Sequence, residues 1–196
     1  AGVGKADWEI NLGLDNDIFC FNVESAVELE IINELAAAKN KVASIALRIN
    51  PEVDAHTHAK ITTGMKENKF GINLSQLGGV LDKLKEMKHV KLIGIHSHIG
   101  SQITDMSSFR NLVIRFNEIQ EELEAHGVTV ENLNFGGGLG IDYYHPNHLS
   151  IPAFDNYFAA IHKLLQVRPG QQVHFEPGRS IVAQCGTLIS KVLYVK

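Results

Sequence analysis

The chain has 196 residues, of which 44% are hydrophobic and 20% are charged, and its formal net charge is -4 at pH 7. This composition supports a folded core and excludes intrinsic disorder, a collagen-like repeat and a coiled coil. It has no basic block, no apolar run of membrane-spanning length and only two, isolated, cysteines, so we expect a cytoplasmic protein without nucleic-acid or membrane partners.

The first expected strand covers 18–23 and is rich in β-branched and aromatic residues. Ser25 and Glu28 follow it in the S-x-x-E form of a capping box, which predicts that a helix begins there. Asn40 is the expected end of this helix, and a second strand follows at 42–50. The apolar spacing predicts that the helix turns these residues inward: Val27, Ile31, Ile32 and Leu35.

A long polar connection at 52–72 separates the second strand from the next helix, and connections of that length are usually functional. Three further helices follow, the longest of which we expect to end at Gly127. Their expected inward residues are Leu77, Leu81, Leu84, Phe109, Leu112, Val113, Phe116, Ile119, Leu123, Phe154, Tyr157, Phe158, Ile161 and Leu165. The remaining expected strands are 91–99, 132–135, 172–175 and 187–195.

Strands that alternate with helices predict a parallel sheet, because a helix carries the chain back between parallel strands. Polar residues and glycines follow several strand ends, as they do at the rim of a (β/α)8 barrel, whereas a doubly wound sheet gathers its ligands at one switch point. These residues are Asn22, Arg48, Asn50, His98, Gly136, Gly137, Gly138, Glu176 and Arg179. The strands are fewer than the eight of a closed barrel, so we expect an α/β fold of the TIM type with an incomplete barrel.

Three glycines, Gly136, Gly137 and Gly138, directly follow a strand in the segment NFGGGLGI. Consecutive glycines allow backbone amides to approach an anion such as phosphate. The alternative interpretation is a tight turn that binds no ligand, because such a turn also requires glycines. Their spacing does not fit the dinucleotide-binding fingerprint, and no lysine of a P-loop follows.

A carboxylate, a glycine amide and a guanidinium stand together in FEPGRSIV, at the end of the next strand. Glu176 could accept a hydrogen bond from a protonated ring nitrogen, while Gly178 and Arg179 could bind phosphate or carboxylate oxygens. The simpler alternative is a surface salt bridge between Glu176 and Arg179.

Two histidines, His96 and His98, lie on one face of an expected strand. Such a pair at a strand end would suit a metal-dependent barrel hydrolase. In the alternative interpretation His98 forms one face of a ligand pocket, with Ser101 and nearby amides as donors. His96 could also be simply a buried core residue. No second histidine stands at another expected strand end, so the metal site is the weaker interpretation.

Taken together, these segments resemble the fold-type-III pyridoxal-phosphate decarboxylases. The matching motifs are LRINP at 47–51, ENKFGI at 67–72, HIGSQ at 98–102, GGGLGI at 136–141 and EPGRSIVA at 176–183. The glutamine of HIGSQ and the sequence RSIVA most resemble the branch that acts on meso-diaminopimelate. The resemblance covers 2–196 and implies a homodimeric lyase that uses pyridoxal 5′-phosphate to convert this amino acid to L-lysine and CO2.

The resemblance also implies a role for each site residue. His98 would stack on the pyridine ring, and Glu176 would pair with the ring nitrogen and keep it protonated. Arg179 would bind phosphate or the substrate carboxylate, and Arg48 would be a supporting charge near the ring. The phosphate would be held by Ser101 and by the amides of Gly136, Gly137, Gly138 and Gly178.

By the same resemblance, 1–185 corresponds to about strands 3 to 8 of the barrel and 186–196 to the start of a C-terminal β domain. The family lysine that forms a Schiff base with the coenzyme has no counterpart, because Lys5 matches a GVGK turn instead. Neither Cys20 nor Cys185 matches the family cysteine that acts across the dimer interface. We therefore expect the chain alone to be inactive; the alternative functions are a metal-dependent hydrolase and a non-catalytic phosphate-binding module.

Overall fold

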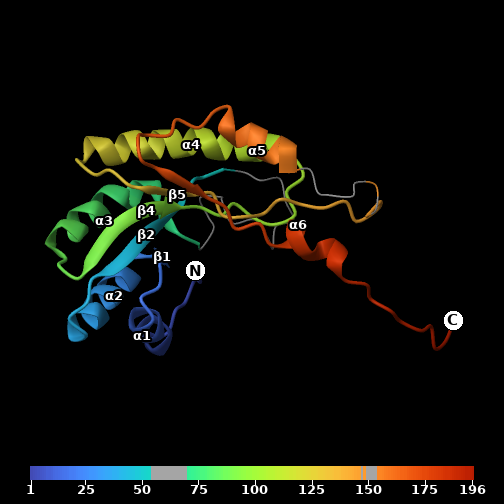
Figure 1. Ribbon diagram of the computed structural model, residues 1–196, viewed down its shortest axis with the longest axis horizontal. Helices are drawn as coiled ribbons and strands as arrows, with labels where there is room; N and C mark the ends of the chain where they lie inside the picture. Colours follow the sequence, from blue (N-terminus) through green and yellow to red (C-terminus); the bar gives the residue numbers. More distant parts are fainter. Residues whose placement is uncertain (54–69, 147, 149–153) are drawn as a thin grey trace.

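The computed structural model describes residues 1–53, 70–146, 148 and 154–196 (Figure 1). Its strands are β1 (Phe21–Val23), β2 (Ala43–Asn50), β3 (Ile72–Asn73), β4 (Val90–His96), β5 (Asn132–Asn134) and β6 (Gln172–His174). Its helices are α1 (Asp7–Asp15), α2 (Ala26–Ala38), α3 (Leu74–Glu86), α4 (Met106–Ala125), α5 (Phe154–His162) and α6 (Arg179–Val182), followed by a 3-10 turn at Ala183–Cys185. Most of the predicted long connection lies outside the described residues.

The strands β1, β2, β4, β5 and β6 lie side by side in chain order and pair in parallel, and β3 pairs with the end of β2. In the view of Figure 1, α4 and α5 lie above the strands and α1 and α2 lie below them. A doubly wound sheet reverses its strand order at a switch point, and the described strands show no such reversal. The consecutive order is that of a barrel wall, which confirms the predicted α/β fold with a partial barrel.

The two faces of the sheet differ in polarity, because successive side chains of a strand point to opposite faces. One set of alternate residues is apolar, is buried and belongs to the same core as the helices: Phe21, Val23, Ile45, Leu47, Ile49, Ile95 and Leu133. The other set lines a hollow of about 330 Å³ and includes Asn22, Ala46, Asn132, Asn134 and His174. The hollow is also lined by apolar residues such as Phe19 and Ile93, but the polar side chains of the strands collect on this face, opposite the one that packs in the core with the helices.

The two edge strands of the described sheet, β1 and β6, come close together across this hollow. The ring centroids of Phe19 and His174 are 5.6 Å apart. Farther along, Nδ2 of Asn22 lies 3.5 Å from Oε1 of Glu176. Because β1 and β6 stand at opposite ends of the pairing order, the sheet must curl with its polar face inside, as a barrel wall does.

Helix α2 begins at the predicted capping signal, with one difference. The hydroxyl of Ser25 accepts a hydrogen bond from the amide of Glu28, but the Glu28 carboxylate accepts from the amide of Glu24 rather than that of Ser25. The prediction that Val27 faces inward is wrong, because its side chain is 64% exposed. Val27 lies two residues, roughly 200° around the helix, from the buried Leu29. The buried face consists of Leu29, Ile32 and Ala36.

Helix α4 ends at the glycine that the sequence indicates. Gly127 has a φ of +74°, a left-handed conformation that other residues adopt at a cost. Its amide donates to the carbonyl of Glu124, and the amide of Val128 donates to the carbonyl of Leu123. These two bonds form a Schellman motif, which pairs carbonyls that the end of a helix would otherwise leave free.

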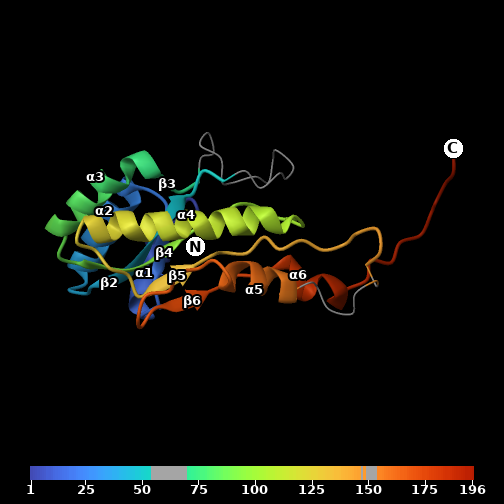
Figure 2. The same cartoon turned by 90° about the horizontal axis from the view of Figure 1, so that it is seen from above.

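Two predictions near the C-terminal end differ from the structure. Phe158 is 41% exposed, whereas its neighbour Tyr157 is the buried ring of α5. The predicted strand at 187–195 is not formed, because it has no partner strand among the described residues to complete its hydrogen bonds. Residues 186–196 extend away from the body in Figures 1 and 2. That they begin a second domain, with 1–185 as the first, stays a prediction.

Candidate active site

One row of side chains crosses the sheet near the carboxyl ends of its strands. Arg48 pairs in register with His96, His96 with Asn134, and Asn134 with His174. Glu176 follows two residues beyond His174. Because parallel strands all end at the same edge, residues far apart in the chain meet here.

The carboxylate of Glu176 is held by side chains from three strands. Nε2 of His96 lies 3.3 Å from Oε2, Nδ2 of Asn134 lies 2.9 Å from Oε1, and Asn22 is 3.5 Å from the same oxygen. The hydrogen bond from His96, with smaller contributions that include Asn134 and the amino group of Ala1, lowers the pKa of Glu176 to about 2, although partial burial opposes this. Glu176 is therefore an anion at neutral pH, able to accept hydrogen bonds but not to donate them.

The imidazole of His98 is half-buried and neutral. Burial, followed by the charge of Arg48 and the nearby His96, lowers its pKa to about 4, while Glu176 and Glu24 act in the opposite direction. Nδ1 of the ring accepts a hydrogen bond from a backbone amide over 3.2 Å. In the neutral ring the hydrogen therefore sits on Nε2. A flat, uncharged ring in a fixed orientation suits stacking against an aromatic ligand.

The glycine triplet is required by close packing of the loops around it. A Cβ on Gly137 would lie 2.1 Å from the carbonyl oxygen of Glu176. A Cβ on Gly136 would lie 2.4 Å from the carbonyl oxygen of Ser97, and Gly136 also has a φ of +63°. The space beside each of these glycines is thus filled by neighbouring backbone, so they bring the loops after β4, β5 and β6 together.

Two amides of the triplet have partners within the protein. The amide of Gly136 donates to Oδ1 of Asn134 over 2.9 Å, and the amide of Gly137 donates to Nδ1 of His98. The carbonyl of Gly136 accepts from the amide of Glu176 over 2.7 Å. The triplet, His98 and Glu176 are therefore in direct contact. That the triplet amides bind phosphate stays a prediction.

Arg48 is held by a buried carboxylate that the sequence analysis did not single out. Its Nη1 lies 2.6 Å from Oε1 of Glu24, and both side chains are almost fully buried. Oε2 of Glu24 accepts from the amide of Gly71, and the guanidinium lies 5.2 Å from the ring centroid of Phe70. The signal available in the sequence was position: Glu24 follows β1 on the same face as Asn22, by the alternation of strand side chains.

Gln102 joins three loops at the same rim. Its Oε1 accepts from the amide of Ile141 and from Nη1 of Arg179, each over 3.2 Å, and its Nε2 donates to the carbonyl of Ile141 over 2.6 Å. Arg179 is exposed, and its guanidinium lies 5.9 Å from the ring centroid of Tyr143. Since Arg179 turns to Gln102, the alternative of a salt bridge between it and Glu176 is wrong.

Ser101 and Gly178 occupy the loops on either side of this rim. Ser101 is half-buried in the segment after β4. Gly178 directly precedes α6, and an added Cβ there would meet nothing within 4 Å. The backbone of Gly178 is therefore open to a ligand from that side, and the predicted roles of both residues in phosphate binding remain predictions.

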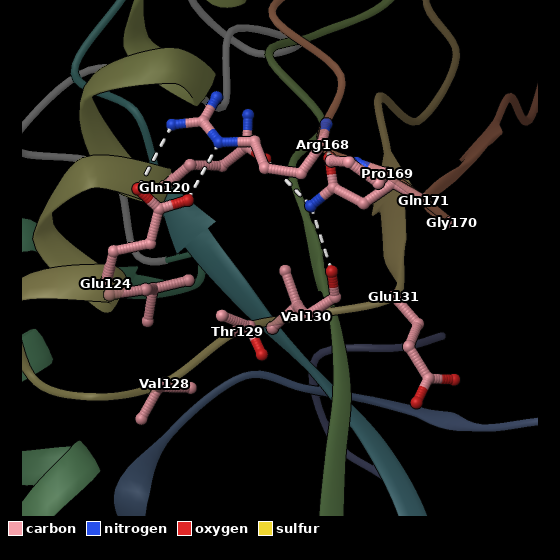
Figure 3. A pocket seen from close by; sticks show the side chains of 11 residues that line it. Gln120, Glu124, Val128, Thr129, Val130, Glu131, Arg168, Pro169, Gly170 and Gln171 are labelled. Carbon is pink, nitrogen blue, oxygen red and sulfur yellow. Dashed lines mark hydrogen bonds and ion pairs between the residues drawn. The ribbon is translucent and has the colours of Figure 1, made fainter.

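A second hollow, of about 400 Å³, lies at the opposite end of the strands (Figure 3). Nε2 of Gln171 donates to Oε1 of Gln120 over 2.8 Å and to the carbonyl of Val130 over 2.9 Å. Arg168 pairs with Glu124 at its rim. The polar side chains of this hollow bind one another at the amino ends of β5 and β6. In a barrel of this type that end contributes to stability, whereas the active site lies at the carboxyl ends of the strands.

The two histidines of the H-x-H pair have different partners: His96 faces Glu176, and His98 accepts from Gly137. Within 1–53, 70–146, 148 and 154–196, no three His, Cys, Asp or Glu side chains converge as a metal site would require. Across the same ranges, no helix combines the length and apolar character needed to span a membrane.

Comparison with known proteins gives consistent matches. Residues 1–183 match the family model described as "Pyridoxal-dependent decarboxylase, pyridoxal binding domain". The whole chain is 64% identical over 196 residues to a diaminopimelate decarboxylase of Bacteroides thetaiotaomicron, covering 51% of that protein. It is 41% identical over 198 residues to one of Haemophilus influenzae, covering 46% of it.

Solved structures give the same result. A crystal structure of diaminopimelate decarboxylase from Helicobacter pylori, complexed with L-lysine, matches with a TM-score of 0.83 and 36% identity. The match covers 92% of this chain and 45% of that one. The chain spans about half the length of the curated relatives it matches.

Proposed function

The chain belongs to the pyridoxal-dependent decarboxylases, and from this premise we propose that it binds pyridoxal 5′-phosphate at the carboxyl ends of β4, β5 and β6. We further propose that the protein carrying it is a carboxy-lyase that converts meso-diaminopimelate to L-lysine and CO2. The names of its relatives support this substrate. A homodimer and a cytoplasmic location complete the proposal.

The observation that carries the proposal is the direct contact between His98, Glu176 and the glycine triplet. His98 accepts from the amide of Gly137, and Glu176 is bonded through its backbone to Gly136. The anionic carboxylate of Glu176 fits the ring nitrogen of the coenzyme, and the neutral ring of His98 fits its face. Because the amides of Gly136 and Gly137 already donate within the protein, the phosphate would be held by the remaining predicted donors at the rim, Ser101, Gly138 and Gly178. The donor chemistry of these residues therefore fits the group.

Bound pyridoxal phosphate supplies an electron sink for the carbanion that remains when CO2 leaves. Glu176 would accept a hydrogen bond from the ring nitrogen, and because its own pKa is about 2 it would leave the proton on that nitrogen. The neutral ring of His98 would cover one face and exclude water. Arg179, tethered by Gln102, would supply positive charge, and Arg48 would stand near the ring as a second cation fixed by Glu24.

The test is an assay of the protein that carries this chain, expressed from its complete gene. We expect CO2 and L-lysine to form from meso-diaminopimelate, and activity to require added pyridoxal phosphate after dialysis. CO2 release from L-ornithine or L-arginine alone would overturn the proposed substrate. Failure to bind pyridoxal phosphate would overturn the proposed function as a whole.

A further inference from the structure

We propose that His96 and Asn134 are positioning residues that fix Glu176 as an anion directed at the ring nitrogen of the coenzyme. The inference rests on the proposed function for the identity of the ligand. The contacts of His96 and Asn134 with Glu176 are present in the structure without any ligand. The contact with Glu176 gives a role to His96, for which the sequence left a metal ligand and a buried core histidine as alternatives.

Each oxygen of the Glu176 carboxylate has a close donor of its own, and Asn22 lies farther from Oε1, at 3.5 Å. Nε2 of His96 lies 3.3 Å from Oε2 and Nδ2 of Asn134 lies 2.9 Å from Oε1. Rotation of the carboxylate about its last torsion would break both contacts, so together they fix its plane. The donors come from β4 and β5, whose register holds His96 opposite Asn134. The orientation of Glu176 is therefore set by the sheet, although Glu176 itself lies on a loop.

Burial explains why a histidine stands at this position. The side chain of His96 is 2% exposed. Because an ionised carboxylate only accepts hydrogen bonds, Nε2 of His96 carries the hydrogen, and Nδ1 then lies buried with no partner in the described structure. An unpaired buried nitrogen is unfavourable, and an apolar side chain would fill the site more stably. Packing does not account for the imidazole, whereas its contact with Glu176 does.

Asn134 couples the carboxylate to the glycine loop. Its Nδ2 donates to Glu176, while its Oδ1 accepts from the amide of Gly136 over 2.9 Å. An amide side chain can serve both partners because it carries a donor and an acceptor on one carbon. An aspartate here would keep the acceptor for Gly136 and place a second negative charge beside Glu176.

Other titratable groups face Glu176 but form no direct hydrogen bond to its carboxylate. The thiol of Cys20 has a raised pKa, caused mainly by burial and partly by the charge of Glu176. His98 is neutral near pH 7, and the amino group of Ala1 contributes a smaller, favourable charge. His96 and Asn134 are the two closest donors to this carboxylate, so variants at these positions test most directly how its pKa is set.

The experiment measures the pKa of Glu176 in the 196-residue chain without coenzyme, by NMR of carboxyl-labelled glutamate. In His96→Leu we expect the pKa to rise from about 2 at least halfway to the ordinary 4.5. His96→Gln keeps an amide donor that can reach Oε2, so it should largely restore the low pKa. The matched control is His89→Leu, directly before the amino end of β4, where Nδ1 of the imidazole lies 3.0 Å from the carbonyl oxygen of Lys41. It should leave Glu176 unchanged.

Asn134→Asp provides a second route to the same measurement if His96→Leu does not fold. We expect the pKa of Glu176 to rise in Asn134→Asp as well, because a donor is replaced by a charge of like sign. A pKa near 2 in both variants would overturn the inference and would leave the proposed function standing.

A second readout uses the protein that carries this chain. We expect His96→Leu to weaken pyridoxal phosphate binding roughly tenfold and His96→Gln to stay within about threefold of the original, a pattern that general destabilisation would not produce. Equal losses in both variants would overturn the positioning role. If the original protein binds no coenzyme, the proposed function fails and the ring-nitrogen part of the inference fails with it.

Discussion

The backbone amide of Gly137 donates its hydrogen to Nδ1 of His98 over 3.2 Å, which ties the loop after β5 to the ring that follows β4. The bond assigns the hydrogen of the neutral imidazole to Nε2. It also fixes the ring plane through the backbone of a second loop, in addition to the side-chain torsions of His98. The orientation of the predicted stacking surface is therefore set by a contact within the protein itself.

A first prediction concerns the loss of stability at low pH. An unfolded histidine takes up its proton near 6.5, whereas burial holds the pKa of His98 at about 4. The contribution of this group to stability is thus complete above pH 6.5 and is lost as the pH falls toward 4, by about 3 kcal/mol at most. The free energy of unfolding in urea should fall less steeply across this window in His98→Gln than in the original chain. Equal slopes would contradict the prediction.

A second prediction concerns the close approach of the loops at Gly137. In Gly137→Ala the added methyl group would lie 2.1 Å from the carbonyl oxygen of Glu176, so the two loops must separate. We expect a loss of at least about 2 kcal/mol in the free energy of unfolding. The control is Gly79→Ala in the interior of α3, where a Cβ meets nothing within 4 Å. Alanine there should stabilise the chain by up to about 1 kcal/mol.

Much of the fold could be predicted from the sequence because its signals are local. The spacing of Phe109, Leu112 and Phe116 predicts the buried face of α4, and Gly127 predicts its end, since both depend on residues within one helix. Val27 shares its helical spacing with Ile31 and Leu35, and this spacing does not show that α2 buries the face of Leu29 instead. The outcome at 187–195 could not be predicted either, because the burial of its apolar residues depends on a partner strand. Local pattern cannot tell whether that partner is present.

Some residues of the candidate site could likewise be predicted from the sequence, and others could not. The motifs placed Glu176 and His98 at strand ends, where parallel strands converge. The contact between His96 and Glu176 joins residues 80 positions apart, and it depends on the register of three strands. The roles of Glu24 and Gln102 depend in the same way on loops that meet only in the folded chain.

A third prediction compares a buried ion pair with an exposed one. Removal of Glu24 leaves the guanidinium of Arg48 buried without its carboxylate, so Glu24→Ala should cost about 3 kcal/mol in the free energy of unfolding. Glu30 pairs with Lys83 on the surface, where both side chains are roughly half-exposed. Glu30→Ala should therefore cost less than about 0.5 kcal/mol. Similar losses in the two variants would show that burial does not decide the strength of the pair.

The last prediction concerns turnover by the complete protein. Glu176→Ala removes the anion that would keep the ring nitrogen of the coenzyme protonated, and a hydrogen bond to a charged group contributes about 1.5 to 3 kcal/mol. Because each 1.36 kcal/mol of barrier is about tenfold in rate, kcat should fall by at least one order of magnitude. The control is Glu131→Ala, an exposed acid beside the amino end of β5, which should leave kcat unchanged. Full turnover in Glu176→Ala would remove the electronic role of this carboxylate, even if the coenzyme still bound.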